Sequence, residues 1–469
     1  MNRFALRVLA GIILILFIAT MGACDAGAEQ REQIPEDEKM STPVPTTTET
    51  PEAKPTNEIA VDLSCSDIVD LNSVEIPADV TSLDLSFNEI IDLSPLAKYT
   101  NLVKLNLSDN KITDISPLSG LTNLVELNLS NNRQVLGYES LKSLTKLATL
   151  NVNNGEESVS DLSVIATLTT LTDLNLWGSN LTDIAQIQSL VNLRRLELSS
   201  VSAINDIFPL ATLTNLEELK LSVPWGTDYT PLKSLTKLTT LEVWGGGFTN
   251  LSNLSNLTTL TNLTLYGHFF TDITPLASLT NLRYLNIGNN MVEDLSPISS
   301  LVNLITLEIP YNEVSTLDTL QTKNLVNLTK LNLDFNHNLA DLSPLSELKE
   351  LKVLYIGNMS VSDLSPLEAL TSLTELDIAV NKVNDISVLA GLHNLTILRM
   401  NDNNVSDISS LASLTRLTKL WMLQNPITDL SPLQKLENLE ELWVSFKDIS
   451  DFSPVEHVLY VEDDPASVC

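Results

Sequence analysis

Fifteen aspartates recur at nearly constant spacing, and a regular series of carboxylates is a series of potential cation ligands. The members are Asp70, Asp92, Asp114, Asp161, Asp183, Asp206, Asp228, Asp272, Asp294, Asp341, Asp363, Asp385, Asp407, Asp429 and Asp451. Calcium takes six to eight oxygen ligands, whereas each interval supplies one such carboxylate. We therefore expect no metal and no other cofactor here, and interpret these aspartates as structural.

The remaining residue types that could support catalysis are scattered. The four histidines, His268, His337, His393 and His457, lie far apart and lack the spacing of metal ligands. The glycines at 245–247 are not followed by the lysine that a phosphate-binding loop requires. The sequence contains neither G-x-S-x-G nor C-x-x-C. We expect no catalytic residues, no small-molecule substrate and no enzyme activity.

One cysteine lies where covalent modification is expected. Arg3 and Arg7 precede the uncharged apolar run VLAGIILILFIATMGA, which is the order of a signal segment. The run ends in MGAC, and this resembles the bacterial lipobox, with methionine where leucine is usual. The resemblance implies removal of residues 1–23, a palmitate-type lipid on Cys24 and anchoring in the cell membrane. An uncleaved anchor and ordinary secretion are the alternatives, and all three place the remaining chain outside the cytoplasm.

The segment that follows, residues 24–58, differs in composition from the rest of the chain. It contains five of the 20 prolines, together with clustered threonine and charged residues and few large apolar ones. Such a segment cannot bury enough surface to fold. We predict a disordered tether rich in Pro, Thr and Glu, which would hold the folded part away from the membrane.

The charge of the chain limits its partners. The formal net charge is −32, from 27 Lys and Arg against 59 Asp and Glu. This excess of negative charge argues against binding to nucleic acid and against docking on an anionic membrane surface. It favours a partner that is basic or that binds through divalent ions.

Most of the chain repeats one phrase, exemplified by LVKLNLSDNKITDISPLSGLTN at 102–123. When the copies are aligned on the second leucine of L-x-x-L-x-L-x-x-N, 18 coils extend from Val61 to Leu442. Twelve of the 17 intervals are 22 residues, and none exceeds 24. Such a period predicts a solenoid, in which each repeat packs on its neighbours. Cys65 and Cys469 lie at opposite ends of this array, so we expect them to be unpaired.

The phrase also predicts the path of each coil. In the L-x-L segment the leucines face inward and their neighbours outward, so successive segments form a parallel sheet. The asparagine that follows is suited to bond turn backbone. The recurrent Ser-Pro after Asp-x suggests serine as the N-cap and proline as the first residue of a helical turn, with the aspartate capping or bracing that turn. The predicted fold is an α/β solenoid over residues 59–469 with terminal caps: a curved array of about 18 coils, a concave parallel β-sheet and short 3₁₀ turns on the convex side.

The elements LSNN, ITDISPL and SGLTNL at this period resemble the internalin-type leucine-rich repeats of bacterial surface proteins. They are also similar to the repeats of an intracellular phosphatase regulatory subunit, but the signal segment argues against that class. The internalin resemblance implies a surface protein that binds another protein through its concave strand face. We find no LPxTG tail, which fits lipid anchoring.

Specificity must come from the outward-facing positions of the strands, because the leucines are structural. Tryptophan and tyrosine are enriched there, and these residue types anchor protein interfaces. The candidate partner-binding residues are Trp177, Trp244, Tyr266, Tyr284, Tyr355, Trp421, Trp443, Lys220, Glu242 and Arg399. Strand propensity alone is the simpler explanation for the aromatics. The hypothesis is a surface-anchored scaffold for a protein partner; the alternative is an accessory lipoprotein that organises the cell's own envelope.

Overall fold

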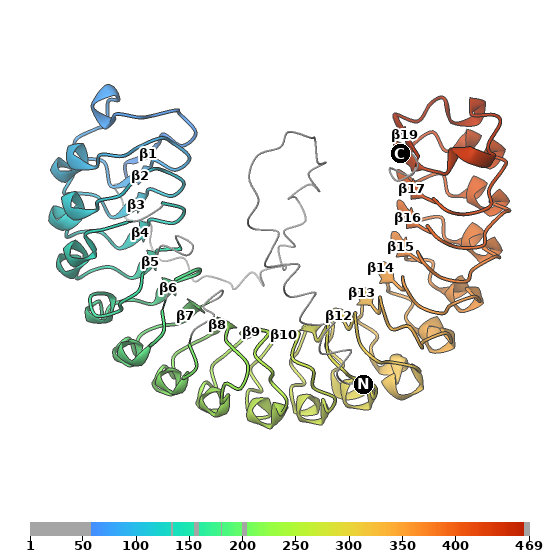
Figure 1. Ribbon diagram of the computed structural model, residues 1–469, viewed down its shortest axis with the longest axis horizontal. Helices are drawn as coiled ribbons and strands as arrows, with labels where there is room; N and C mark the ends of the chain where they lie inside the picture. The colour runs from blue at the N-terminus through green and yellow to red at the C-terminus, as the bar shows by residue number, and fades with distance from the viewer. Residues whose placement is uncertain (1–57, 133–134, 154–158, 180, 199–203, 464–469) are drawn as a thin grey trace, which may run out of the picture. The chain divides into compact units, whose positions relative to one another are not determined.

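The computed structural model describes residues 58–132, 135–153, 159–179, 181–198 and 204–463. The signal segment, Cys24, nearly all of the tether and Cys469 lie outside these residues. The described residues form one parallel sheet of 19 strands on the inner side of an arc, with short helical turns on the outer side (Figure 1). Each strand pairs in parallel with the next along the chain, from Ala60–Ser82 through Leu442–Val461. The predicted solenoid is confirmed.

Every strand from β1 to β18 contains the aligned leucine of its coil, or Val61 in β1. The strands are β1 (Ala60–Asp62), β2 (Ser82–Asp84), β3 (Lys104–Asn106), β4 (Glu126–Asn128), β5 (Thr149–Asn151), β6 (Asp173–Asn175), β7 (Arg195–Leu198), β8 (Glu218–Ser222), β9 (Thr240–Trp244), β10 (Asn262–Tyr266), β11 (Tyr284–Asn286), β12 (Thr306–Glu308), β13 (Lys330–Asn332), β14 (Val353–Tyr355), β15 (Glu375–Asp377), β16 (Ile397–Arg399), β17 (Lys419–Trp421), β18 (Glu441–Trp443) and β19 (Tyr460–Glu462).

The return path of each coil is a 3₁₀ turn, as predicted. These turns are η2 (Leu71–Ser73), η3 (Ser94–Lys98), η4 (Ser116–Gly120), η5 (Tyr138–Ser143), η7 (Ile165–Thr167), η8 (Ala185–Ser189), η9 (Phe208–Thr212), η10 (Thr230–Ser234), η11 (Leu251–Leu254), η12 (Thr274–Ser278), η13 (Ser296–Ser300), η14 (Asp318–Leu320), η15 (Thr322–Asn324), η16 (Ser343–Glu347), η17 (Ser365–Ala369), η18 (Ser387–Gly391), η19 (Ser409–Ser413), η20 (Ser431–Lys435), η21 (Phe446–Asp448) and η22 (Ser453–Val455). Within the described ranges, no helix has the length and apolar character needed to cross a bilayer.

The array ends one strand later than the sequence period indicates. Val461 of β19 pairs with Leu442 of β18, only 19 residues after it and without the repeated phrase. Val461 itself is half-buried, and the neighbouring Tyr460 is 63% exposed. The last strand therefore acts as a cap that covers the final coil.

Between the sheet and the outer turns runs one continuous apolar spine. The inward leucines, such as Leu105 and Leu107, are at most 2% exposed. Their burial removes apolar surface from water in every coil. Because each coil buries its leucines against the coils before and after it, no coil can be stable alone.

The asparagines that recur at one position of the coil bond the backbone, as predicted. Asn312 is typical: its Nδ2 donates to the carbonyls of Ile287, Ile309 and Pro310, at 3.0, 3.3 and 3.1 Å. Its Oδ1 accepts the N–H of Val292 at 3.0 Å. The side chain thereby joins its own turn to the preceding coil. Equivalent bonds are made by Asn88, Asn110, Asn132, Asn290, Asn336, Asn381, Asn403 and Asn425.

A histidine replaces this asparagine in the middle of the array. His268 is fully buried; its Nδ1 accepts the N–H of Phe248 at 3.2 Å, and its Nε2 lies 2.9 Å from the Val243 carbonyl. Burial lowers its pKa to about 4, so the ring stays neutral and serves the fold.

The expectation that aspartate caps or braces the 3₁₀ turn is confirmed, whereas the N-cap role expected of serine was wrong. In the coil of η17, Oδ1 of Asp363 accepts the backbone N–H of Ser365 at 2.8 Å. Ser365 is the first residue of the turn and Pro366 the second. The carboxylate bonds the unpaired amide at the start of the turn and leaves the proline, which has no N–H, in the next position.

We predict that Asn312→Ala will lower the free energy of unfolding by about 2–4 kcal/mol, because it leaves several buried backbone groups unpaired. Urea unfolding followed by circular dichroism measures this change. The matched control is Asn303→Ala: this exposed amide makes a single bond, to the Thr280 carbonyl. Its loss should cost less than about 1 kcal/mol; equal costs for the two variants would contradict the proposed role of the buried amides.

Candidate functional site

Six of the seven predicted aromatic residues lie on strands of the inner sheet, and Trp177 lies in the turn two residues after β6. Trp177 and Trp244 are 38% and 41% exposed, whereas the other five are half-buried by neighbouring side chains. The expectation that all of them point freely into solvent is therefore met by only two. The structure places them in two groups and leaves Trp177 apart from both.

The first group lies on β17 and β18. The rings of Trp421 and Trp443 have centroids 6.2 Å apart in an edge-to-face arrangement. Both indole N–H groups donate to Oε1 of Glu441, each at 2.8 Å, and Lys419 Nζ lies 3.1 Å from Oε2. Burial raises the pKa of Glu441, but these bonds outweigh it and the net shift is downward. The carboxylate therefore stays ionised and fixes both rings.

The same group continues along the sheet toward β13. The guanidinium of Arg399 lies 4.5 Å from the centre of the Trp421 ring and forms an ion pair with Glu375. The Tyr355 hydroxyl donates to Glu375 at 2.9 Å, and Lys330 Nζ lies 5.4 Å from the centre of the Tyr355 ring. Aromatic rings and charged groups thus alternate in direct contact from β13 to β18.

The second group is centred on β8 to β11. The Trp244 and Tyr266 rings are 5.7 Å apart, and Lys220 lies 3.6 Å from Glu242. Gly288 makes room for Tyr266, since a Cβ atom there would lie 2.9 Å from the tyrosine ring. Burial raises the pKa of Tyr284 to about 12, so its hydroxyl remains a hydrogen-bond donor.

Sequence reasoning missed Trp225, the most exposed tryptophan at 58%. It lies in the loop after β8, and its ring is 5.2 Å from that of Phe269. A Cβ atom on Gly247 would lie 2.5 Å from the Trp225 ring. The glycine run at 245–247 was the available signal, because Gly247 makes room for the aromatic side chain.

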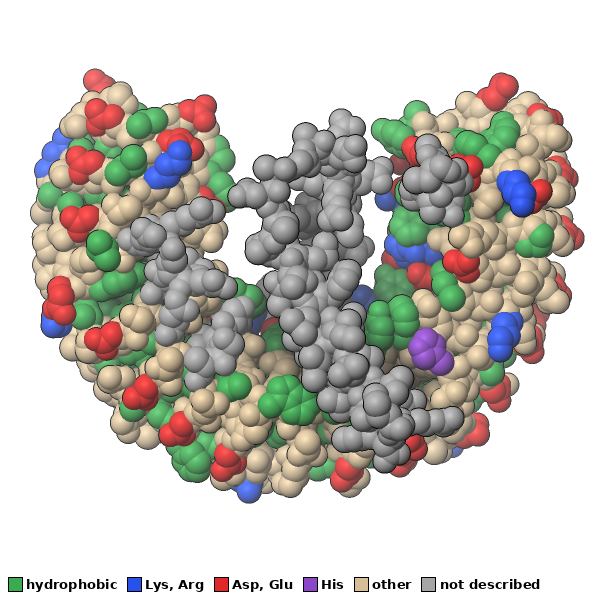
Figure 2. Space-filling model, in the orientation of Figure 1, with side chains coloured by type: hydrophobic (Ala, Val, Ile, Leu, Met, Phe, Trp, Pro, Cys, Tyr) green, Lys and Arg blue, Asp and Glu red, His purple; other side chains and the backbone are tan. Residues whose placement is uncertain are grey.

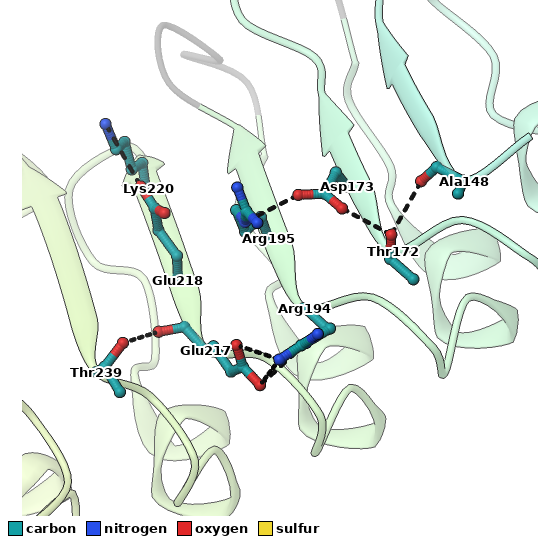
Figure 3. A network of polar contacts seen from close by, with 9 residues as sticks. All are labelled: Ala148, Thr172, Asp173, Arg194, Arg195, Glu217, Glu218, Lys220 and Thr239. Atoms are coloured by element: carbon teal, nitrogen blue, oxygen red, sulfur yellow. Dashed lines mark hydrogen bonds and ion pairs between the residues drawn. The ribbon is translucent and has the colours of Figure 1, made fainter. Parts of the chain in front are cut away.

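A hollow of about 210 Å³ with both polar and apolar lining residues lies nearer the N-terminal arm, over β5 to β8. Arg195 Nε is 2.9 Å from Asp173 Oδ1, and Thr172 donates to the other oxygen of Asp173 at 2.6 Å (Figure 3). Lys220 and Glu218, which lie 3.7 Å apart, also line it. Trp177 is not part of this lining; its backbone N–H donates to Oδ1 of Asn175, which is.

Two carboxylates on the inner face are not among the candidate partner-binding residues. Asp334 and Asp377 lie on either side of Gly357, where a Cβ atom would be 3.3 and 3.4 Å from their Oδ1 atoms. Burial raises the pKa of Asp334 to about 7, and burial also raises that of Asp377. In the part of the chain that the structure describes, no three His, Cys, Asp or Glu side chains are grouped as metal ligands.

Comparison with known proteins agrees with this geometry. A family model described as leucine-rich repeats in two copies matches residues 79–120, 100–142, 258–300, 349–391 and 393–435. The chain carries a leucine-rich-repeat array. No curated protein sequence matches it.

Several solved leucine-rich-repeat structures resemble this one. An internalin (inlF) from Listeria monocytogenes is 29% identical over 70% of this chain and 89% of its own, with a TM-score of 0.54. A leucine-rich-repeat protein from Leptospira interrogans is 24% identical over 81% of this chain and 94% of its own, with a TM-score of 0.60. The ectodomain of the Arabidopsis receptor kinase HAESA, solved with a peptide hormone ligand, is 21% identical over 87% of this chain and 74% of its own, with a TM-score of 0.61. The last two show the fold alone.

We predict that Asp334 makes stability depend on pH. Its folded pKa of about 7 exceeds the value near 4 of an unfolded carboxyl. Between these values the folded chain keeps a proton that the unfolded chain releases, so stability falls as the pH rises from about 4 to 7. Asp334→Asn cannot titrate but can still accept the Gly357 N–H. At pH 8 this variant should be more stable than wild type by on the order of 1–2 kcal/mol.

Urea midpoints at pH 5 and pH 8 measure this difference, which should be smaller at pH 5. Asp402→Asn is the control, because Asp402 is exposed and the substitution removes the same charge. If both variants gained equally at pH 8, the cause would be net charge and not the burial of Asp334.

Proposed function

We propose that this chain is a surface-anchored, non-enzymatic scaffold that holds a protein partner on the inner face of its leucine-rich-repeat arc. The observation that supports this most directly is the chain of contacts from Lys330 to Trp443, in which rings and charges alternate on a solvent-facing sheet. The fold does not require these residues, because the leucine spine and the amide bonds hold each coil.

The same contacts hold the side chains in one conformation before a partner arrives. Both indole N–H groups share Glu441, and Arg399 is fixed between Glu375 and Trp421. A side chain that is already ordered loses less conformational entropy on binding. Tryptophan, tyrosine and arginine are also the types that contribute most to protein interfaces. The face is therefore suited to bind a folded protein or an extended segment.

The anchor is a second part of the proposal. A lipid on Cys24 and a tether over residues 24–58 would hold the arc outside the cell membrane of a bacterium. The 29% identity to a Listeria internalin supports a surface role. A partner on another cell or host surface is the main form of the proposal, and a component of the cell's own envelope is the alternative.

We predict that Trp421→Ala with Trp443→Ala will abolish capture of the partner without unfolding the chain. The full chain in mild detergent is used to capture proteins from host-surface extract and from extract of its own envelope. Phe208→Ala, which removes an exposed aromatic residue from η9 on the outer side, is the matched control and should capture normally. Capture that survives the tryptophan changes but is lost with Phe208 would place the site on the outer side. The extract that yields the partner decides between the two forms of the proposal.

We also predict that Cys24→Ser will prevent incorporation of labelled palmitate and move the protein from the membrane fraction to the soluble fraction. Cys65→Ser is the control, because Cys65 is an exposed free thiol within the array and should not affect labelling. Label retained in the Cys24 variant would rule out lipidation at this cysteine.

A further inference from the structure

One backbone position of the coil is left-handed in both arms of the array: the residue directly before the buried asparagine, four after the aligned leucine. In many coils this position holds asparagine or aspartate, which tolerate a left-handed backbone; examples are Asn131 (φ 56°), Asn289 (φ 53°), Asn358 (φ 52°) and Asp402 (φ 52°). Glycine occupies it in others, such as Gly245 (φ 66°). The turn thus selects small or amide side chains at this position.

Four coils break this preference: one contains Phe87 (φ 54°) near the N-terminal end of the array, and the other three lie in one region. Tyr311 (φ 56°), Phe335 (φ 60°) and Val380 (φ 53°) carry bulky or β-branched side chains in the same conformation. A left-handed backbone is unfavourable for such residues, and most unfavourable for the β-branched valine. The hydrogen bonds made there do not need these side chains, since they use the N–H groups of Tyr311 and Val380, which donate to Asp334 O and Asn401 O.

The side chains also contribute little to the core. Tyr311 and Val380 are 43% and 42% exposed. The rings of Tyr311 and Phe335 stack on each other, with centroids 4.0 Å apart and planes within 10°. Hydrophobic side chains are visible on the inner side of the arc near β12 to β14 (Figure 2). We call Tyr311, Phe335 and Val380 the apolar rim. It places apolar surface in water at unfavourable backbone angles, which is the combination expected of a binding surface.

Charge beside the rim indicates what it binds. Asp334 directly precedes Phe335, and Asp377 is three residues before Val380; both carboxylates lie beside Gly357. Among the described residues, no Lys, Arg or His lies within ion-pair distance of either carboxylate. Arg399 attracts both from farther away, but it already pairs with Glu375, so three carboxyl groups share one guanidinium. Acidic side chains also outnumber basic ones on the visible surface (Figure 2).

We propose that the apolar rim and the carboxylates of Asp334 and Asp377 form the docking site for a protein segment that carries an arginine or lysine next to an apolar residue. The cation lies over Gly357 between the two carboxylates, and the apolar side chain packs on the Tyr311–Phe335 stack or on Val380. Gly357 leaves the approach to the carboxylates open, because a Cβ atom at this position would lie 3.3 and 3.4 Å from their Oδ1 atoms. This inference rests on the proposed function and specifies its partner class.

The backbone conformation provides a test that separates binding from folding. Phe335→Asn and Val380→Asn install the residue type found at Asn289 and Asn358, so each should raise the Tm, by roughly 1–2 °C. The same variants should weaken binding at least about tenfold. Gln424→Asn is the matched control: Gln424 is also left-handed (φ 54°) but lies two coils beyond Val380. It should raise the Tm similarly and leave binding unchanged.

The probe is a phage-displayed library of random peptides of about 12 residues, selected on the immobilised full chain. We expect enrichment of Arg or Lys beside Leu, Phe or Trp, and a loss of at least about tenfold in affinity on Asp334→Asn with Asp377→Asn. Enriched peptides without a cation, or binding that is indifferent to the rim variants, would overturn the inference. Binding lost only in the Trp421 and Trp443 variants would overturn it while leaving the proposed function intact. A selection that yields no peptide would count against both.

Discussion

The asparagine amide that joins the turn of a coil to the preceding coil, in nine of the described coils, is the interaction on which the regular parts of the array depend. A turn that folds back inside the protein leaves carbonyl and N–H groups away from water, and these must be paired. Asn312 and its equivalents pair three carbonyls and one N–H with a single side chain. Once the backbone groups of the turn are hydrogen-bonded, the strand before the turn is held in register with its neighbours. The outward side chains of these strands then form a continuous face.

The period of the leucines was sufficient to predict the solenoid, the parallel sheet and the 3₁₀ turns, because each follows from one residue type at one phase. The cap could not be assigned to one side chain because Asp363 and Ser365 are both good caps, and only geometry shows which oxygen receives the amide. The cap strand Tyr460–Glu462 was missed because it does not carry the phrase.

The candidate face was predictable in outline and not in its contacts. Alternation places Trp421 and Trp443 on the inner side, but sharing of Glu441 between them depends on side-chain conformations that no spacing specifies. Trp225, Tyr311 and Phe335 were missed because they lie in turns, outside the strand positions considered. The informative feature at Tyr311 and Phe335 is a positive φ occupied by a large residue, and φ cannot be read from one sequence.

Contacts that reach only to adjacent coils have an evolutionary consequence. Duplication or deletion of one 22-residue unit would add or remove one row of the inner face while preserving the hydrogen bonds of every other coil. Such a change between β15 and β17 would alter the separation of Val380 from Trp443 without altering either neighbourhood. The spacing between recognition elements can therefore evolve independently of their chemistry, in steps of one strand.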